Sequence, residues 1–524
     1  MSEKDHMRRY IAEEAIEFLK DKDTICISGS GGGLLEPDFI LQALEKRFLQ
    51  TGHPRDLTIV HAASLGDSEK TGLNRLTHAG MVKRVIGGHW GWSPRMAEMA
   101  LGGDIEAYNF PQGAISLLFR EIAAGRPGLF TKTGLHTFAD PRVEGGRLNK
   151  RTPQEIVSVR EIENEEYLFF KSFPISAAFL VGSIADEKGN ISFEHEAAYL
   201  DALAMAMAAH NSGGHVFVQV KKIVPAETLD ARLVKIPGIF VDFVIENPDQ
   251  WQTYEGEYNP AFSGEKRVPV NSLKPLPLNA RKIIARRAAL ELKPDLVVNL
   301  GFGMPDGVAA VAAEEGISNW LHFTVEQGPV GGVPAKGAIF GVSTNPDAIL
   351  DMPSNFDFYQ GGGLDLAVLS FAQVDNEGNV NVSKFGNRLA GCGGFVDISQ
   401  NAKKVVFVGT FTAGGLEIEI VNGKLAIKRE GKHKKFLKSV EQITFSGRYA
   451  SDNHQQVLYV TERAVFKLVS GKLMLIEIAP GIDLEKDILP HIDFMPEIST
   501  EMKTMRAALF LAGRLGFDQI AEAD

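Results

Sequence analysis

The chain has little of what marks a secreted or membrane protein. It holds only two cysteines in 524 residues, Cys26 and Cys392. They lie too far apart in sequence to form a metal-binding or redox pair, so we expect no disulfide framework and a reducing compartment. No apolar run precedes a cleavage site near the N-terminus, and none reaches the ~18 residues that a membrane span needs. These absences predict a cytoplasmic protein that makes no use of a membrane.

An excess of positive charge is also missing. The formal net charge is −11 and the isoelectric point is near 5.7. This balance argues against non-specific binding to nucleic acid or to an anionic membrane, which requires a positive field. A polyanionic small ligand could still be held by a local basic patch.

What is present is the composition of an ordinary globular protein. Apolar residues make up 44% of the chain and charged residues 23%. The length supports two to four domains, each large enough to bury a substantial core.

An internal repeat is the strongest sign of organisation. Residues 13–31 (EEAIEFLKDKDTICISGSG) follow the pattern of an amphipathic helix, a turn, an apolar strand and a glycine turn. Residues 286–303 (RRAALELKPDLVVNLGFG) repeat that order, with Gly29 matching Gly301 and Gly31 matching Gly303. Helix and strand alternating in this way predict parallel α/β sheets.

A second pair of motifs extends the repeat. DEKGNIS at 186–192 and DNEGNVN at 375–381 each follow an apolar run that predicts a strand. Each is followed in turn by a further strand candidate, HVFVQV at 215–220 and KVVFVG at 404–409. The fold class that we predict is therefore α/β, with two related open-sheet domains.

The two halves are unequal and are joined by a linker. From Gly29 to Asp186 is a span of 157 residues, against 74 from Gly301 to Asp375. Residues 251–278 are rich in proline and polar residues and lack clean periodicity, which is typical of a stiffened connection. We predict an N-terminal domain at 1–250, a linker at 251–278 and a C-terminal domain at 279–524. The active site is expected at the domain interface, beyond the carboxyl ends of the strands.

Glu326 is the candidate for chemistry. It stands in TVEQGPVGGVP (324–334), among glycines that permit tight turns and close approach of a ligand to the main chain. A carboxylate kept out of water beside a thioester can attack the carbonyl carbon. The alternative is an ordinary surface glutamate in a glycine-rich loop.

Eight dispersed motifs give the chain a resemblance to a known family. They are SGSGGGLLEPDF (28–39), GGHWG (87–91), AYNFPQG (107–113), VNLGFGMPDG (298–307), TVEQGPVGG (324–332), FYQGGGLD (358–365), GCGGFVDIS (391–399) and YVTERAVF (459–466). Over essentially its whole length the chain resembles the family I coenzyme A transferases in their fused form. It is most similar to bacterial acyl-CoA:acetate/3-ketoacid and propionate CoA-transferases. In that family the glutamate of a Glu-Asn-Gly-like tripeptide is the nucleophile, and Glu326 occupies its position, with Gln327 in place of asparagine.

The resemblance implies a set of site residues around Glu326. It makes Asn299 and the backbone N–H groups around Gly393 and Gly394 candidates for stabilising an oxyanion. Gln112, with Asn109 nearby, corresponds to a polar group on the substrate side, although Gln112 could instead cap a helix after Pro111. Gly301, Gly303 and Gly328 are the candidates for the CoA-binding turns.

Three further features have simpler interpretations. Cys392 lacks an evident basic partner, so packing is favoured over a nucleophilic role. His89 and Trp90 could line an acyl pocket but are more typical of packed structural residues. The basic run from Lys424 to Lys438 could meet CoA phosphates, whereas such runs usually form solvated hairpins.

The function that the resemblance implies is transfer of CoA between a short-chain acyl-CoA and a carboxylate such as acetate, propionate or a 3-keto acid. The route is a covalent glutamyl-CoA thioester. That chemistry needs no metal, nicotinamide or ATP, in agreement with the absence of Walker-type, HExxH and paired-cysteine motifs. Two alternatives stay open, an acyl-CoA hydrolase that uses the same glutamate and a non-catalytic sensor of CoA or a sugar phosphate. The family also implies a homotetramer or homodimer.

Overall fold

The computed structural model describes residues 9–269 and 275–517. They form two compact units, each assembled from separate stretches of the chain. Unit 1 holds the chain up to Val268 together with Val325–Phe358 and Asn387–Asp397. Unit 2 holds Pro269–Thr324, Tyr359–Gly386 and the chain from Ile398 onward.

Unit 1 is built on a sheet whose main path is parallel throughout, in the order β1-β13-β11-β9-β2-β3-β4-β5. Every residue of β9 is buried, as expected for a strand covered on both faces. The short strand β10 pairs antiparallel with β9, and β12 pairs antiparallel with β10. The strands are β1 (Arg9–Tyr10), β2 (Thr24–Ile27), β3 (Leu57–His61), β4 (Val82–Gly87), β5 (Glu106–Asn109), β9 (Ala177–Asp186), β10 (Ile191–Ser192), β11 (His215–Val224), β12 (Val234–Ile236) and β13 (Phe243–Glu246).

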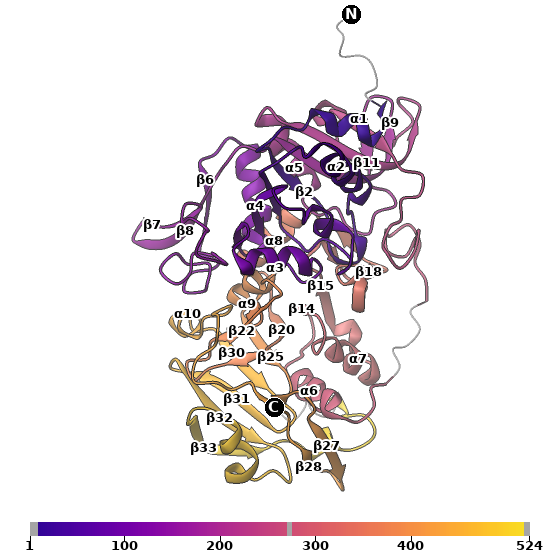
Figure 1. Ribbon diagram of the computed structural model, residues 1–524. Helices are drawn as coiled ribbons and strands as arrows, with labels where there is room; N and C mark the ends of the chain where they lie inside the picture. The colour runs from indigo at the N-terminus through magenta and orange to yellow at the C-terminus, as the bar shows by residue number, and fades with distance from the viewer. Residues whose placement is uncertain (1–8, 270–274, 518–524) are drawn as a thin grey trace, which may run out of the picture. The chain divides into compact units, whose positions relative to one another are not determined.

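Helices pack on this sheet. Helix α5 contacts β9 and β11 and lies against α4, and Figure 1 shows both beside the indigo and magenta strands. The helices are α1 (Ala12–Ala15), α2 (Asp38–Thr51), α3 (Pro94–Gly102), α4 (Gln112–Ala123) and α5 (Ala202–Asn211). Unit 1 also carries an antiparallel sheet of β6 (Gly128–Thr131), β8 (Glu165–Lys171) and β7 (Val157–Ile162), and the short strands β16 (Pro329–Val330), β17 (Val333–Pro334), β18 (Ser343–Thr344), β19 (Ala348–Ile349) and β24 (Arg388–Leu389). Helices α8 (Met352–Gln360) and α9 (Phe395–Asn401) begin in unit 1 and end in unit 2.

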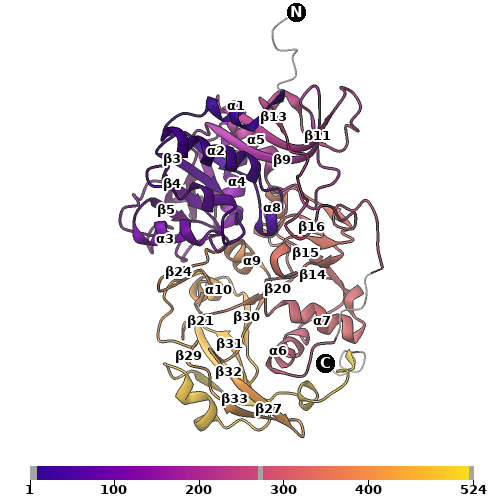
Figure 2. The same cartoon turned by 45° about the vertical axis from the view of Figure 1, so that its right-hand side comes forward.

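Unit 2 holds most of the strands of a second sheet. Its parallel part runs β15-β14-β20-β25-β30, and β31, β32 and β33 extend it on one side. Helices α6 and α7 lie side by side in both views and contact strands of this sheet (Figures 1 and 2). The main elements are α6 (Ala280–Ala289), β14 (Leu296–Leu300), α7 (Asp306–Glu315), β15 (Leu321–Thr324), β20 (Leu366–Ser370), β25 (Lys404–Val408), α10 (Gly447–Asp452), β30 (Gln456–Val460), β31 (Ala464–Val469), β32 (Lys472–Ile478) and β33 (Glu497–Thr504). Shorter strands are β21 (Gln373–Val374), β22 (Val380–Asn381), β23 (Lys384–Phe385), β26 (Thr412–Ala413), β27 (Glu417–Val421), β28 (Lys424–Arg429) and β29 (His433–Lys434).

The predicted repeat is confirmed in the strand order. The path β3-β2-β9-β11-β13 of unit 1 is matched by β15-β14-β20-β25-β30 of unit 2, and every pairing along both paths is parallel. The predicted strands at 215–220 and 404–409 are β11 and β25. The helix before β2 is shorter than predicted, because α1 gives way to a 3₁₀ turn at Ile16–Phe18.

The second motif of the repeat forms the same turn twice. The Asp186 carboxylate accepts hydrogen bonds from the backbone N–H of Lys188 and from both the backbone and the side chain of Asn190, at 2.9 to 3.0 Å. Asp375 accepts the equivalent three from Glu377 and Asn379, at 3.0 to 3.1 Å. An aspartate that bonds the backbone two residues on is a turn former, so the two sequences specify one local structure.

The predicted linker, 251–278, contains the change from unit 1 to unit 2 at Val268 and Pro269. Its residues 270–274 lie outside the described residues. Its first part packs on unit 1, where the Tyr254 N–H donates to the Gly32 carbonyl at 2.7 Å and the Tyr254 hydroxyl donates to Glu36 at 2.7 Å. The compact units do not follow the order of the chain, so the boundaries at 250 and 279 remain a prediction about the repeat.

Candidate active site

Glu326 lies in a tight turn that directly follows β15 in the chain. The Gly328 N–H donates to the Val325 carbonyl at 2.9 Å, and the Asn355 amide donates to the carbonyls of Val325 and Glu326 at 3.0 and 3.2 Å. Gly328 has a φ of +120°, and a Cβ there would stand 2.1 Å from the Leu350 carbonyl oxygen. Only glycine fits this position, so the backbone on both sides of Glu326 is held in one conformation.

The surroundings of the Glu326 carboxyl disfavour its charged form. Burial and, to a lesser extent, the negative charge of Asp397 raise its pKa, a hydrogen bond from Gln327 lowers it, and the net result is a pKa of about 7. The Gln327 amide lies 3.4 Å from Glu326 Oε1 and 3.3 Å from the Ser30 hydroxyl. Within residues 9–269 and 275–517, no lysine, arginine or histidine forms an ion pair with Glu326. A carboxylate with a raised pKa and no paired cation is more basic than usual and therefore a better nucleophile.

Asp397 is anchored by the start of α4. Its Oδ2 atom accepts a hydrogen bond from the Gly113 N–H at 3.0 Å, and its side chain is fully buried. A Cβ at residue 113 would stand 2.3 Å from Oδ1, so Gly113 is needed for this contact. The first turn of a helix favours a negative charge, which explains how a buried carboxylate is tolerated beside a second one. Asp397 belongs to the motif GCGGFVDIS (391–399), and no role was predicted for it from the sequence.

Gln112 is the first residue of α4 and does not cap it. The side chain is almost fully buried, and its amide Nε2 lies 3.2 Å from the Met352 sulfur. The capping role that the sequence left open is therefore wrong. A thioether is a weak acceptor, so the Gln112 amide is available to a stronger one.

Asn109, at the end of β5, holds neighbouring backbone in place. With its amide turned to satisfy both groups, it donates to the carbonyls of Gly87 and Gly88 at 3.3 and 3.0 Å. Cys392 lies close by, and its thiol donates to the Phe110 carbonyl at 3.1 Å. Burial raises the pKa of the Cys392 thiol well above its ordinary value. This agrees with the packing role favoured for Cys392.

The candidate oxyanion donors differ in what they already bond. The Gly393 N–H donates to the Gly88 carbonyl at 2.8 Å. The next N–H, that of Gly394, is buried and has no acceptor in the described part of the chain. In unit 2 the Asn299 amide donates to the Thr324 carbonyl at 3.2 Å and to the Tyr359 hydroxyl at 3.3 Å. Of these groups, the Gly394 N–H is free to meet a ligand.

The glycines predicted to bind CoA differ in their backbone conformation, and CoA binding by them stays a prediction. Gly301 and Gly303 follow β14 in unit 2, and Gly303 has a φ of +89° with open space where a Cβ would be. A Cβ at Gly301 would stand 2.9 Å from the Leu369 side chain, so its need for glycine comes from packing.

The basic run from Lys424 to Lys438 is largely a solvated hairpin. Strands β27 and β28 pair there, and Lys428 and Arg429 form exposed ion pairs with Glu419 and Glu417 at 2.5 Å. Lys435 is the buried member, with its amine 3.9 Å from the centre of the Phe371 ring, and burial lowers its pKa to about 7.

The described residues hold neither a candidate metal cluster nor a helix able to span a membrane. No group of three or more histidine, cysteine, aspartate or glutamate side chains there is arranged to hold a metal ion. None of the described helices combines the length and the apolar character needed to cross a membrane.

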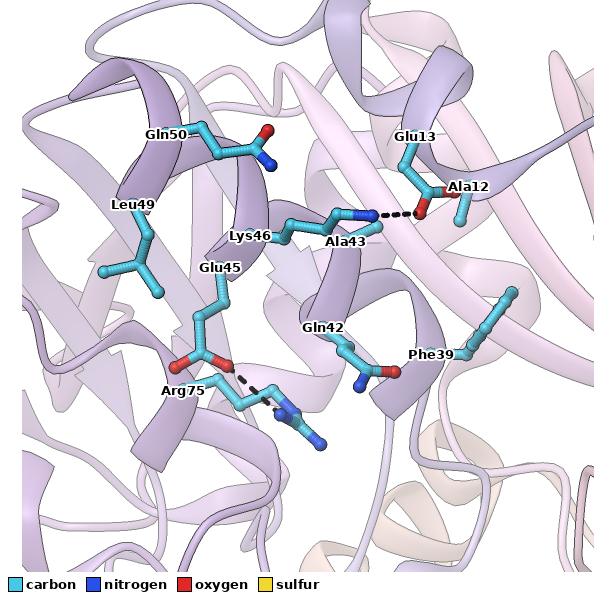
Figure 3. A pocket seen from close by; sticks show the side chains of 10 residues that line it. All are labelled: Ala12, Glu13, Phe39, Gln42, Ala43, Glu45, Lys46, Leu49, Gln50 and Arg75. Atoms are coloured by element: carbon cyan, nitrogen blue, oxygen red, sulfur yellow. Dashed lines mark hydrogen bonds and ion pairs between the residues drawn. The ribbon is translucent and has the colours of Figure 1, made fainter.

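A pocket of about 540 Å³ lies elsewhere in unit 1 (Figure 3). Its wall is formed by Ala12, Glu13, Phe39, Gln42, Ala43, Glu45, Lys46, Leu49, Gln50 and Arg75. The charged groups face one another, since Lys46 pairs with Glu13 and Arg75 with Glu45, each at 3.1 Å. None of the predicted site residues lines this pocket, and we assign it no part in the chemistry.

Comparison with known proteins agrees with these features. Residues 9–247 match the model of the coenzyme A transferase family. The chain is 46% identical to the acetate CoA-transferase YdiF of Escherichia coli K12, covering 97% of this chain and 96% of YdiF. It is 47% identical to the caffeate CoA-transferase of Acetobacterium woodii, covering 98% and 99%. Among solved structures, the E. coli O157:H7 acyl-CoA transferase YdiF in a thioester complex with CoA superimposes with a TM-score of 0.92 at 45% identity, covering 98% of each chain.

These matches extend over almost the entire length of the chain and both of its units. The protein belongs to the coenzyme A transferase family, and it is an enzyme of the CoA-transferase class in the fused form that carries both homologous halves in one polypeptide. This membership excludes the non-catalytic sensor that the sequence left open.

Proposed function

We propose that this enzyme transfers CoA from a short-chain acyl-CoA to a free carboxylate such as acetate, with Glu326 as the covalent nucleophile. The observation that carries the proposal is the Glu326 carboxyl itself, held in a glycine-bounded turn with its pKa raised to about 7 and no paired cation among the described residues. The relatives named for acetate and caffeate transfer support the reaction class, and they differ in the acid that they use.

The chemistry follows from a basic carboxylate beside a thioester. A Glu326 oxygen attacks the acyl carbonyl carbon, and the C–S bond breaks to give an acyl-glutamyl anhydride and CoA thiolate. The thiolate then attacks the glutamyl carbonyl, which releases the first carboxylate and leaves a glutamyl-CoA thioester. An incoming carboxylate runs the same steps in reverse. The thioester bond is exchanged and no net proton is consumed.

Each tetrahedral intermediate carries a negative oxygen that needs donors already in place. The Gln112 amide and the free Gly394 N–H are the groups that we assign to it. Asn299 and Gly393 then act by holding backbone in position, because their N–H groups are occupied. Losing one oxyanion donor typically costs ~2.7 to 4 kcal/mol of barrier.

Hydrolysis by the same glutamate is the second candidate, since water can open the anhydride. Consumption of acyl-CoA with and without added acetate separates the two. If the enzyme is a transferase, the rate of acyl-CoA consumption depends on acetate, and acetyl-CoA forms in proportion to the acyl-CoA consumed. Consumption at one rate regardless of acetate would establish the hydrolase.

We also propose a homotetramer or homodimer, which the family resemblance supports.

The covalent step is tested by trapping. Wild-type enzyme is incubated with acyl-CoA and then with borohydride, which reduces a glutamyl thioester to an alcohol and changes the mass of the peptide containing Glu326. We expect Glu326→Ala to lose both this change and transfer, with its fold intact by circular dichroism. Gln327→Ala is the neighbouring control and should still be trapped. Near-normal turnover by Glu326→Ala would rule out the mechanism.

A further inference from the structure

His89 is held firmly at the edge of the site. It lies in the loop that follows β4 in unit 1 and forms an antiparallel bridge with Gly391. On either side, the Trp90 N–H donates to the Ala390 carbonyl at 2.8 Å, and the Gly88 carbonyl accepts from Gly393 at 2.8 Å. Three backbone contacts therefore fix the loop against the segment that carries Gly393 and Gly394.

One hydrogen bond determines where the proton of the His89 ring resides. The Gly91 N–H is shared between the Ala390 carbonyl at 3.1 Å and Nδ1 at 3.2 Å, so Nδ1 acts as an acceptor and Nε2 carries the hydrogen in the neutral ring. Burial, with a smaller contribution from His61, lowers the His89 pKa to about 4, which keeps the ring neutral at physiological pH. The side chain retains some exposure, and no acceptor for Nε2 exists among residues 9–269 and 275–517. The ring thus presents an unused neutral donor.

That donor borders a notch in the site. A Cβ added at Gly393 would lie 3.5 Å from His89 Cδ2 and 3.6 Å from Gln112 Oε1, with no other atom within 4 Å. The space is open because residue 393 has no side chain. Nε2 is bonded to Cδ2 within the ring, so it lies near the same opening. The free N–H of Gly394 follows directly in the chain.

We propose that the Nε2–H of His89 donates a hydrogen bond to the acyl oxygen of the thioester substrate in the notch over Gly393, near the Gly394 N–H. This inference rests on the proposed transfer of CoA through Glu326. It makes His89 a catalytic residue that assists each tetrahedral intermediate.

A neutral ring suits this task better than a charged one. An imidazolium here would add a positive charge to the site and would weaken a carboxylate nucleophile by stabilising its charge. A neutral imidazole N–H donates without that effect. The bond from Gly91 and the burial of the ring keep it in the useful tautomer before substrate arrives.

Two substitutions separate donation from packing. His89→Phe keeps the size of the ring and removes the N–H, whereas His89→Gln keeps a neutral donor in a different shape. We expect kcat of His89→Phe to fall by about 100-fold, at the low end of the loss for one oxyanion donor. His89→Gln should retain at least about ten times the kcat of His89→Phe, since it keeps a donor. KM for acetyl-CoA and the melting temperature should change little in either variant.

The measurement is acetyl-CoA-dependent transfer to propionate, with melting temperatures recorded on the same preparations. His433→Gln, on the exposed strand β29, is the matched control. Equal kcat in His89→Phe and His89→Gln, or a higher value in His89→Phe, would show a packing role and overturn the inference. If the wild type and His433→Gln themselves fail to transfer CoA, the proposed function fails instead.

Discussion

At the scale of the residue, Glu326 combines two properties that usually oppose each other. A nucleophile must be ionised, yet a carboxylate surrounded by protein resists ionisation. Burial and Asp397 together bring its pKa to about 7, where much of it is ionised near neutral pH and the ionised form is strongly basic. Because attack on the thioester moves the negative charge from Glu326 to the substrate oxygen and then to the CoA thiolate, the reaction also relieves the repulsion between the two carboxylates.

This arrangement predicts the pH dependence of the wild type and of Asp397→Asn. Below about pH 7 Glu326 becomes protonated, so kcat/KM for acyl-CoA should fall about tenfold per pH unit on the acid side. The asparagine side chain of the variant keeps an acceptor for the Gly113 N–H and removes the negative charge. The Glu326 pKa should then be lower, and the acid limb should move to lower pH. Steady-state rates between about pH 5 and 9 measure the shift.

Asp347→Asn is the control for that experiment. Asp347 lies in the same unit and is exposed, with its carboxylate 2.7 Å from Arg267. Its profile should coincide with that of the wild type. An acid limb that stays in place in Asp397→Asn would show that Asp397 does not act on Glu326 through its charge.

At the scale of the element, the turn at Val325–Gly328 shows why this loop is rich in glycine. Gly328 combines a positive φ with a Leu350 carbonyl oxygen where a Cβ would be. Gly337 also has a positive φ, of +69°, but nothing stands within 4 Å of the Cβ position. Comparison of the two glycines therefore separates the effect of a positive φ from the effect of close contact with another backbone carbonyl.

We predict that Gly328→Ala lowers kcat strongly, because the backbone must shift and carries Glu326 with it. A displacement of about 1 Å at a reacting group can cost ~100-fold in rate. Gly337→Ala only places an alanine at a positive φ, which costs roughly 1 kcal/mol. This variant should keep most of its activity. Transfer rates and melting temperatures of both variants test this. Equal effects on kcat would mean that close approach at Gly328 does not position the nucleophile.

At the scale of the molecule, the two units share one strand order but not one continuous stretch of chain. Segments Val325–Phe358 and Asn387–Asp397 come from the C-terminal half and pack within unit 1. The Met352 N–H donates to the Leu200 carbonyl and the Asn345 N–H to the Ala261 carbonyl, each at 2.8 Å. Unit 1 is therefore incomplete without the second half of the chain.

A split protein tests this dependence. Residues 1–268 made alone should bind a hydrophobic dye and unfold at lower temperature than the intact chain, because the surface under the two segments is uncovered. Co-expression with residues 269–524 should restore transfer activity, since the missing segments are then supplied in trans. Cooperative unfolding of the isolated 1–268 fragment at the wild-type temperature, without dye binding, would contradict the prediction.

Much of the fold could be predicted because its signals are local. The apolar runs at β9, β11, β20 and β25 and the aspartate turns at Asp186 and Asp375 each specify their structure within a few residues. The repeat of these signals was enough to predict two related parallel sheets. The short α1 was missed because apolar spacing does not show where a helix passes into a 3₁₀ turn.

The site was predicted in part, for a different reason. Glu326 stands out in the sequence by its residue type and its glycine neighbours, and the family resemblance carried Gln112 and Gly394 with it. No role was predicted for Asp397, and packing was favoured for His89, since a buried aspartate and a histidine beside tryptophan are ordinary features of a sequence. Nothing local shows that one carboxylate will raise the pKa of another or that the N–H of Gly91 will fix a tautomer.

By itself, the sequence determined most of the elements and the duplication and pointed to the proposed nucleophile, because each depends on residues close together in the chain or on a motif that survives intact. The tertiary structure alone decided which N–H groups are occupied and which are free, what charge stands beside Glu326, and that parts of the second half complete unit 1. These properties arise from atoms brought together across hundreds of residues, where burial and distance set the energies. Spacing along the chain carries no record of them.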